Sequence, residues 1–376
     1  MALFLCLPAL SFGQQGAEPA GTGAQTTTAP ASAPNDPVLT LRPPPKAPKL
    51  ASPVTPEGRI HLDVVVTDAA GQPVLGLEPP DFKLLDDHQP RKILSFRSSD
   101  GINVKPDPPV EVILLLDTVN LPFQQVAFTR QEIAKFLRQN GGHLAQPVSL
   151  MLLTDAGLLF QPRPSADGNA VVTVLDQIKG GIHTIYGAMG SDGDLQRFQL
   201  SLRKMAAITE NEARKPGRKL LLWVGPGWPM LDSNNYKFSD KDQRQYFDTI
   251  VELSTRLREA RMAVYSVSAP DAGLGASPDR MFLYQDFLKG VRSARQADTG
   301  NLALKVLALQ SGGRVLGPDN DLAGQINRCI AEANAFYTLS FDPQAAEHAD
   351  EYHDLKVLAG QPGVTVRTSS GYYNQP

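Results

Sequence analysis

Asp117 is the residue in this 376-residue chain whose type and position are best suited to chemistry. It directly follows Val110 to Leu116, a nearly continuous apolar run typical of a buried strand. A carboxylate in such surroundings is costly to desolvate unless a cation or hydrogen-bond donors meet it, so Asp117 is a candidate site residue. The alternative is that it caps the following helix or accepts hydrogen bonds from loop amides.

Other patterns give weaker indications of chemistry. The acidic segment between His348 and His353 could form a metal cluster, but it falls in a predicted polar loop without helical i, i+4 spacing, which favours a solvated connection. The sequence contains no Gly-x-Gly-x-x-Gly fingerprint, no Walker lysine loop and no Gly-x-Ser-x-Gly elbow. A non-catalytic role is therefore expected. The alternative is a hydrolase-type enzyme whose catalytic residues these motifs do not capture.

The overall charge limits the class of partner. Lysine and arginine number 36 and aspartate and glutamate 39, so the net charge is -3. This is too near balance for binding to nucleic acid or to an anionic membrane by bulk charge. We expect no nucleic-acid partner.

The first 58 residues differ in composition from the rest. Ala2 to Phe12 is apolar apart from Ser11 and too short to span a bilayer, which needs about 20 residues, so residues 1–13 are predicted to be a signal peptide. No Lys or Arg precedes Arg42, so the usual positive n-region is absent. Residues 14–58 hold ten prolines and no aromatic residue, which predicts a disordered spacer. We expect export to the periplasm or the extracellular space, with no transmembrane segment after signal removal.

Apolar runs alternate with helical patterns in the middle of the chain. The runs suit strands of a parallel sheet that is covered on both faces, and between them apolar residues recur at helical spacing. This predicts an α/β domain over residues 108–334 with a doubly wound, mostly parallel sheet, in which ligands bind beyond the carboxyl ends of the strands. The strand-like runs are 110–116, 148–153, 220–224 and 262–267.

Shorter strand-like runs flank this domain on both sides. Ile60 to Val66 alternates apolar and polar residues for most of its length, and the runs at 82–85 and 92–96 indicate a hairpin. Sheets of this size rarely stand alone. We therefore predict one small β-rich domain built from residues 59–100 and 335–373, with the α/β domain inserted in it. The C-terminal runs are 336–341, 354–358 and 364–368.

The order of these patterns resembles a known family. Val112 to Asp117, followed by a predicted helix, is similar to the start of a von Willebrand factor A domain. The flanking residues Val64 to Asp68 and Gly71 to Val74, with the ending Val366 to Tyr372, resemble the VWFA-related domain proteins typical of Acidobacteria. The resemblance covers roughly residues 60 to 373. It implies a von Willebrand A-like fold with a metal-ion-dependent adhesion site at the strand ends.

The metal ligands that the resemblance implies are mostly missing. The family's site begins with Asp-x-Ser-x-Ser, but Val119 and Leu121 occupy the two serine positions here. Thr184 is a loosely aligned candidate for a second-loop ligand, and the third loop, Gly225 to Pro229, lacks the expected aspartate. A degenerate site of Asp117 and Thr184 remains. We expect no cofactor, and any Mg²⁺ binding should be weaker than millimolar.

Apolar residues follow the turn in the third loop. Trp228, Met230 and Leu231 come directly after Gly225-Pro226-Gly227, which should project them near the end of the sheet that carries Asp117. Together with Asn120 they are the candidate partner-binding residues, because large apolar side chains dominate interface energetics. The alternative is that they fold back and fill the place of the missing metal site.

These observations favour an exported, non-catalytic interaction module. We expect it to bind a protein partner at the cell envelope through the top of the α/β domain.

Overall fold

The structure is a computed structural model, and it describes residues 58–100, 103–177, 191–231, 238–269 and 284–376. All of these belong to one compact unit, Leu39–Pro376. The expected signal peptide, most of the expected spacer and Thr184 lie outside the described residues. Among the described residues, no helix is both long enough and apolar enough to cross a membrane.

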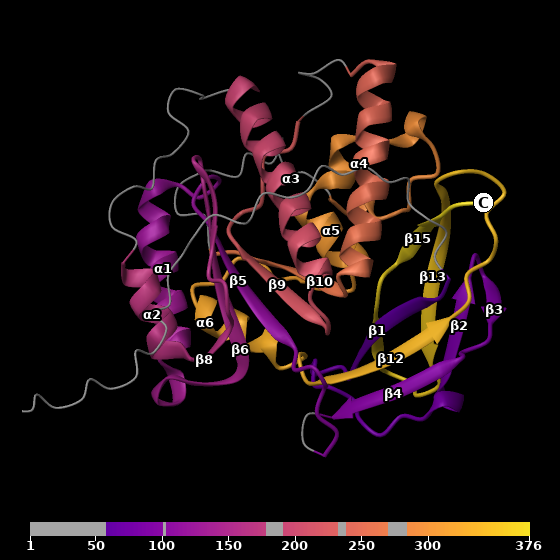
Figure 1. Cartoon of the computed structure of the whole chain (residues 1–376), viewed down its shortest axis with the longest axis horizontal. Coiled ribbons are helices and arrows are strands. Elements are labelled where there is room, and N and C mark those ends of the chain that lie inside the picture. Colours follow the sequence, from indigo (N-terminus) through magenta and orange to yellow (C-terminus); the bar gives the residue numbers. More distant parts are fainter. Residues whose placement is uncertain (1–57, 101–102, 178–190, 232–237, 270–283) are drawn as a thin grey trace, which may run out of the picture. The chain divides into compact units, whose positions relative to one another are not determined.

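A seven-stranded, mostly parallel sheet forms the middle of the chain (Figure 1). Its order is β11-β10-β9-β5-β6-β7, with β8 paired to β6. Neighbours from β11 to β6 are parallel, whereas β7 and β8 are antiparallel to β6. The prediction of a mixed α/β fold with a mostly parallel sheet is confirmed. The strands are β5 (Glu111–Asp117), β6 (His143–Thr154), β7 (Gly157–Phe160), β8 (Ser165–Asp167), β9 (Lys219–Val224), β10 (Met262–Val267) and β11 (Arg314–Val315).

Helices cover both faces of this sheet because its strands are apolar on both sides. Leu114 of β5 belongs to a hydrophobic cluster that includes Ile133 and Ile326, whereas its neighbour Leu115 belongs to a second cluster with Phe198. Figure 1 accordingly shows α1, α2 and α6 on one face and α3, α4 and α5 on the other. The helices are α1 (Phe123–Leu137), α2 (Gly168–Asp176), α3 (Ser191–Ala213), α4 (Asp240–Glu259), α5 (Leu304–Gln310) and α6 (Leu322–Ile330). Short 3-10 helices are η1 (Pro79–Asp81), η2 (Gln139–Gly142), η4 (Tyr284–Phe287), η5 (Ala294–Gln296) and η6 (Thr299–Leu302).

Two four-stranded antiparallel sheets combine strands from before and after the α/β part. One has the order β14-β1-β12-β4 and the other β15-β13-β2-β3. Leu62 of β1 faces Leu339 of β12, and Leu84 of β2 faces Val357 of β13. All four side chains share one hydrophobic cluster, so the two sheets pack against each other. The strands are β1 (Ile60–Thr67), β2 (Phe82–Asp86), β3 (Gln89–Arg91), β4 (Ser95–Asp100), β12 (Ala335–Phe341), β13 (Glu351–Ala359), β14 (Thr365–Arg367) and β15 (Gly371–Asn374).

The expected hairpin between residues 82–85 and 92–96 is wrong in its second strand. Asp87 and His88 have φ of 45° and 66°, which makes a tight two-residue turn between β2 and β3. The partner of β2 therefore begins at Gln89, and β4 pairs with β12 in the other sheet. The sequence does not indicate a turn with two positive φ angles, because neither residue is a glycine.

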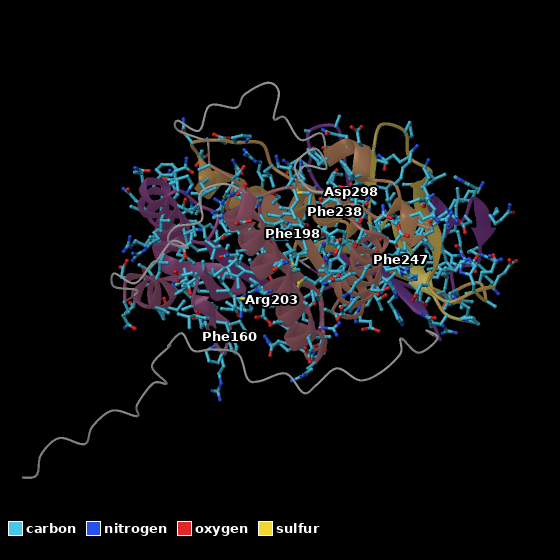
Figure 2. The ribbon with its side chains drawn as sticks, turned by 90° about the horizontal axis from the view of Figure 1, so that it is seen from above. Phe160, Phe198, Arg203, Phe238, Phe247 and Asp298 are labelled. Carbon is cyan, nitrogen blue, oxygen red and sulfur yellow. The ribbon has the colours of Figure 1, made fainter. Side chains whose placement is uncertain are left out.

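Polar and aromatic contacts join the α/β part to the antiparallel sheets. Arg261, just before β10, donates from Nε to Asp63 of β1 at 3.1 Å. The ring of Phe247 on α4 packs edge-on against Tyr373 of β15, with centroids 6.0 Å apart, and Figure 2 shows Phe247 on the side of α4 nearest those strands. Arg314 donates to Glu332, which lies just before β12, at 2.8 Å. The sheets are thus held to the α/β part by buried and partly buried contacts.

Candidate functional site

Asp117 lies where the topology of the parallel sheet favours a ligand. When β8, which lies off the main path, is left out, the strands of this sheet have the order 3-2-1-4-5-6 by their position along the chain. The chain therefore continues from β5 toward one edge of the sheet and from β9 toward the other. In doubly wound sheets the crevice beyond such a switch point is the usual ligand site. Asp117 ends β5 there, and a Cβ on Gly225, just after β9, would come within 2.9 Å of the Cβ of Asp117. The carboxylate therefore packs directly against the end of β9.

All hydrogen-bonding positions of the Asp117 carboxylate are occupied by neutral donors. Oδ1 accepts the backbone N–H groups of Val119 and Asn120 at 3.1 and 3.0 Å. Oδ2 accepts the amide of Asn120 and the indole N–H of Trp223, each at 2.8 Å. Burial raises the pKa of Asp117, and these hydrogen bonds act against that rise. A carboxylate has about four acceptor positions, so none remains for a cation.

The positions expected to have lost metal ligands are part of the core. Val119 and Leu121 are each 4% exposed, and they contribute to the clusters on opposite faces of the sheet. Their side chains offer no oxygen to an ion. Thr184, the second expected ligand, lies outside the described residues. The arrangement at Asp117 matches the alternative in which it accepts hydrogen bonds from loop amides.

The structure corrects two of the expected partner-binding residues. Trp228 and Leu231 are 5% and 3% exposed, and the indole N–H of Trp228 donates to the carbonyl oxygen of Leu302 at 2.9 Å. Trp228 also packs edge-on against Trp223, with centroids 5.1 Å apart. The loop folds back because the free energy is lower when these large apolar side chains are buried than when they are exposed to water. Trp228 and Leu231 therefore match the alternative that the sequence left open, in which these residues fold back and fill the strand end.

Asn120 and Met230, the other two expected partner-binding residues, remain partly exposed beside this closed end. Besides its bond to Asp117, the amide of Asn120 donates to Ser201 of α3 at 3.1 Å. Hydrogen bonds to both Asp117 and Ser201 thus fix the side chain of Asn120.

A second buried polar group was misjudged from the sequence. His353, expected in a solvated loop, lies in β13 and is 2% exposed. Its Nδ1 is 3.3 Å from an oxygen of Asp86 and 3.3 Å from an oxygen of Asp87. Interaction with Asp86 raises the pKa of His353, and burial opposes the rise. His348, by contrast, is exposed, as expected.

The sequence did contain a pattern that could have placed His353. The expected strand began at Asp354, but the two-residue alternation of Leu355 and Val357 continues backward to His353. Residues that alternate in this way share one face of a strand. The inward-facing side chains of β13 therefore include the histidine, and the register brings Asp86 opposite Leu355.

Comparisons with known proteins give no family assignment. No protein-family model and no curated protein sequence matches the chain. Among solved structures, the chain is similar to the pilus adhesin SpaC from Lactobacillus rhamnosus GG, with 9% sequence identity and a TM-score of 0.35. The similarity covers 80% of this chain and 49% of the adhesin chain, so the chain spans about half of that protein's length. A TM-score of this size supports no conclusion about fold or function.

Proposed function

We propose that this chain is an exported, non-catalytic interaction module that binds a protein partner at the cell envelope through the loops beyond β5 and β9. The observation that carries the proposal concerns the switch point between β5 and β9, where the chain's own side chains leave no room for a ligand. The place where such a sheet holds a small ligand is filled by Asp117, Trp223 and Trp228, all buried and hydrogen-bonded to the chain itself. Recognition at this edge then proceeds by surface contact.

We also propose that the α/β part is a von Willebrand factor A-like domain with a degenerate metal site. Two features support this: Asp117 ends the first strand of a doubly wound sheet, and α1 follows it after a short loop. The hydroxyls of Thr118 and Ser201 contact this loop, but neither is hydrogen-bonded to a histidine or carboxylate among the described residues. A nucleophile paired with a base, as a hydrolase requires, is therefore not found around Asp117 in the described part of the chain.

The contact surface centres on Met230 and Asn120. Met230 is partly exposed and follows the exposed Pro226 and the partly exposed Pro229, which restrict the loop backbone. The restricted backbone lowers the entropy that the loop loses on binding, and the flexible side chain of Met230 can adapt its shape to a partner. Asn120 is also partly exposed. Both N–H groups of its amide are used by Asp117 and Ser201, and its Oδ1 is buried, so Asn120 contributes surface contact and no hydrogen bond to a partner.

The test places a photo-crosslinking amino acid at position 230 of the full chain and exposes it to an envelope extract. The control carries the same amino acid at position 94, because Leu94 is an exposed apolar residue of the antiparallel part, 38% exposed. We expect a defined envelope protein to crosslink at position 230 and not at position 94. With that partner purified, Met230→Lys should weaken binding at least about tenfold, which is about 1.4 kcal/mol, and Leu94→Lys should not.

Equal crosslinking at the two positions would contradict the proposed surface. Equal affinity of the partner for Met230→Lys and for the unmodified chain would also contradict the proposed surface. Turnover of a substrate by the purified chain would favour the hydrolase alternative.

A further inference from the structure

The tight turn between β2 and β3 places two consecutive carboxylates beside a buried histidine. Asp86 ends β2, Asp87 opens the turn, and His353 lies in the neighbouring strand β13. The backbone N–H of Asp87 donates to the carbonyl oxygen of Asp354 at 2.9 Å, which fixes the turn against β13. Residues from the two ends of the described chain are thus brought together at one point.

Each carboxylate uses one oxygen for hydrogen bonds and directs the other toward the histidine. Oδ2 of Asp86 accepts the hydroxyl of Tyr372 at 3.0 Å and Nε of Arg91 at 3.2 Å. Its Oδ1 has no hydrogen-bond partner among the described residues, and it lies 3.3 Å from Nδ1 of His353.

Asp87 repeats this division on the other side of the histidine. Oδ1 accepts Arg292 at 2.9 Å and the backbone N–H of Asp354 at 3.1 Å. Oδ2 lies 3.3 Å from Nδ1 of His353. Nδ1 itself forms no hydrogen bond within the part of the chain that the structure describes. Three potential ligand atoms therefore converge, all within 4.8 Å of one another.

The distances suit metal coordination better than hydrogen bonding. A charge-assisted N–H···O bond is about 2.7–2.9 Å long, so two separations of 3.3 Å are too long for strong bonds from an imidazolium. Zinc binds nitrogen and carboxylate oxygen at about 2.0–2.2 Å in tetrahedral geometry, which sets neighbouring ligand atoms about 3.3–3.5 Å apart. Both measured separations fall at the edge length of such a shell.

The surrounding residues orient the three side chains. The ring of Tyr372 stacks on that of His353, with centroids 4.8 Å apart and planes 13° apart, and its hydroxyl holds Asp86. Metal ligands are typically oriented by outer hydrogen bonds of this kind. Nε2 of His353 has no acceptor among the described residues, so the stacked ring of Tyr372 orients the imidazole in place of an outer hydrogen bond.

The local charge also leaves room for a cation. Four carboxylates act here against three basic side chains, so negative charge is in excess. The carboxylates are those of Asp86, Asp87, Glu351 and Asp354, and the basic side chains are those of Arg91, Arg292 and Lys356.

We propose that Asp86, Asp87 and His353 form a binding site for a divalent transition-metal ion of the zinc type, with a water molecule as fourth ligand. One imidazole and two carboxylate oxygens suit zinc, whereas magnesium and calcium prefer six or more oxygen ligands. Asp87 has a side chain 32% exposed, which gives the fourth position access to water. The ion would fasten the β2–β3 turn to β13. This proposal departs from the expectation that the chain has no cofactor, and it does not depend on the function proposed above.

The test uses the full chain, purified without a polyhistidine tag and treated with EDTA, in a calorimetric titration with ZnCl₂. We expect one equivalent to bind with a dissociation constant in the micromolar range or below, and Mg²⁺ and Ca²⁺ not to bind at the same concentrations. Co²⁺ in place of zinc should give the visible absorption of a four-coordinate ion. That spectrum reports ligand geometry, which a merely stabilising role of these residues would not change.

Asp87→Asn is the decisive variant. Asparagine tolerates the positive φ at this position, and its side-chain oxygen can still accept from Arg292, so the turn should persist. We expect it to weaken zinc binding at least about tenfold. Asp354→Asn is the matched control, because it removes a neighbouring carboxylate that is not a ligand and should leave the affinity close to that of the unmodified chain.

Two outcomes would overturn the proposal. One is the absence of saturable zinc binding in the micromolar range. The other is one equivalent bound with equal affinity by Asp87→Asn, which would show adventitious binding only. Circular dichroism of each variant distinguishes loss of a ligand from loss of the fold.

Discussion

Asp117 and Asp86 are both fully buried carboxylates at the ends of strands, yet their surroundings differ. Asp117, in the parallel sheet, accepts four hydrogen bonds from neutral donors and has no unused acceptor position. Asp86, in the antiparallel sheets, directs one unpaired oxygen at a histidine nitrogen that is also unpaired among the described residues. Burial therefore does not identify a binding site by itself. Unused hydrogen-bonding capacity is the more informative property.

At the other end of its strands, the parallel sheet also surrounds a buried charged group with neutral hydrogen-bonding partners. Lys219 opens β9 and is 1% exposed, and its ammonium group donates to the carbonyl oxygens of Gly217 and Ala260 at 3.0 and 3.1 Å. A third carbonyl oxygen, that of Lys215, lies at 2.5 Å. The charged groups at the start of β9 and at the end of β5 thus contribute to the internal structure of the sheet.

The largest expected difference between the two regions is in a matched pair of substitutions, Asp117→Asn and Asp86→Asn. Asparagine at position 117 would turn an NH₂ group toward two of the four donors that now meet the carboxylate, leaving them unsatisfied. Each buried unsatisfied donor costs about 1–3 kcal/mol, so we expect the free energy of unfolding to fall by about 2 kcal/mol or more. At position 86, asparagine can keep its oxygen on Tyr372 and direct its NH₂ group at His353, so a loss of at most about 1 kcal/mol is expected.

Urea denaturation of the two variants and the unmodified chain, all in EDTA, measures this difference. Asp342→Ala is a control for a surface carboxylate, because its side chain is 61% exposed and its ion pair with Arg59 should contribute little. If Asp86→Asn destabilised the chain as much as Asp117→Asn, the distinction between satisfied and unsatisfied carboxylates would be lost.

A smaller effect should appear in the pH dependence of stability through Lys219. Burial lowers the pKa of Lys219 from 10.5 to about 8. Between these pH values the unfolded chain holds a proton that the folded chain has released, so stability should rise with pH from about 8 to about 10.5. Below pH 8 both states are protonated, and this contribution is constant.

The measurement compares unfolding free energies of the unmodified chain and Lys219→Met at about pH 8 and pH 10. We expect the unmodified chain to gain at least about 1 kcal/mol relative to the variant over this interval. A constant difference between them would mean that the three carbonyl oxygens hold the folded-state pKa near its ordinary value.

The sequence predicted the parallel sheet better than it predicted the site. Apolar runs such as 110–116 and 262–267 became β5 and β10 because strands buried on both faces need apolar side chains throughout. Local pattern could not show that Trp228 folds back over the strand end, since that depends on contacts with Trp223 and Leu302. It also could not show that Asp86 and His353 meet, because their pairing follows from a register between distant strands.

The smallest expected effect is the response of the melting temperature to magnesium. It tests whether the four hydrogen bonds of Asp117 exclude a cation. A ligand present at 100 times its dissociation constant stabilises a fold by about 2.7 kcal/mol, which shifts the melting temperature by several degrees in a chain of this size. Magnesium requires a near-octahedral oxygen shell, and binding at Asp117 would have to displace the bonds from Asn120 and Trp223. At a few millimolar Mg²⁺ we therefore expect the melting temperature to change by less than about 1 °C.

The same chain with zinc is the positive comparison, since a zinc-dependent shift should disappear in Asp87→Asn. A clear stabilisation by Mg²⁺ or Mn²⁺ that is absent in Asp117→Ala, each chain being compared with its own metal-free midpoint, would show that the hydrogen bonds at Asp117 give way to a cation. The parallel sheet would then hold a working metal site, and the contrast between the two carboxylates would have to be withdrawn.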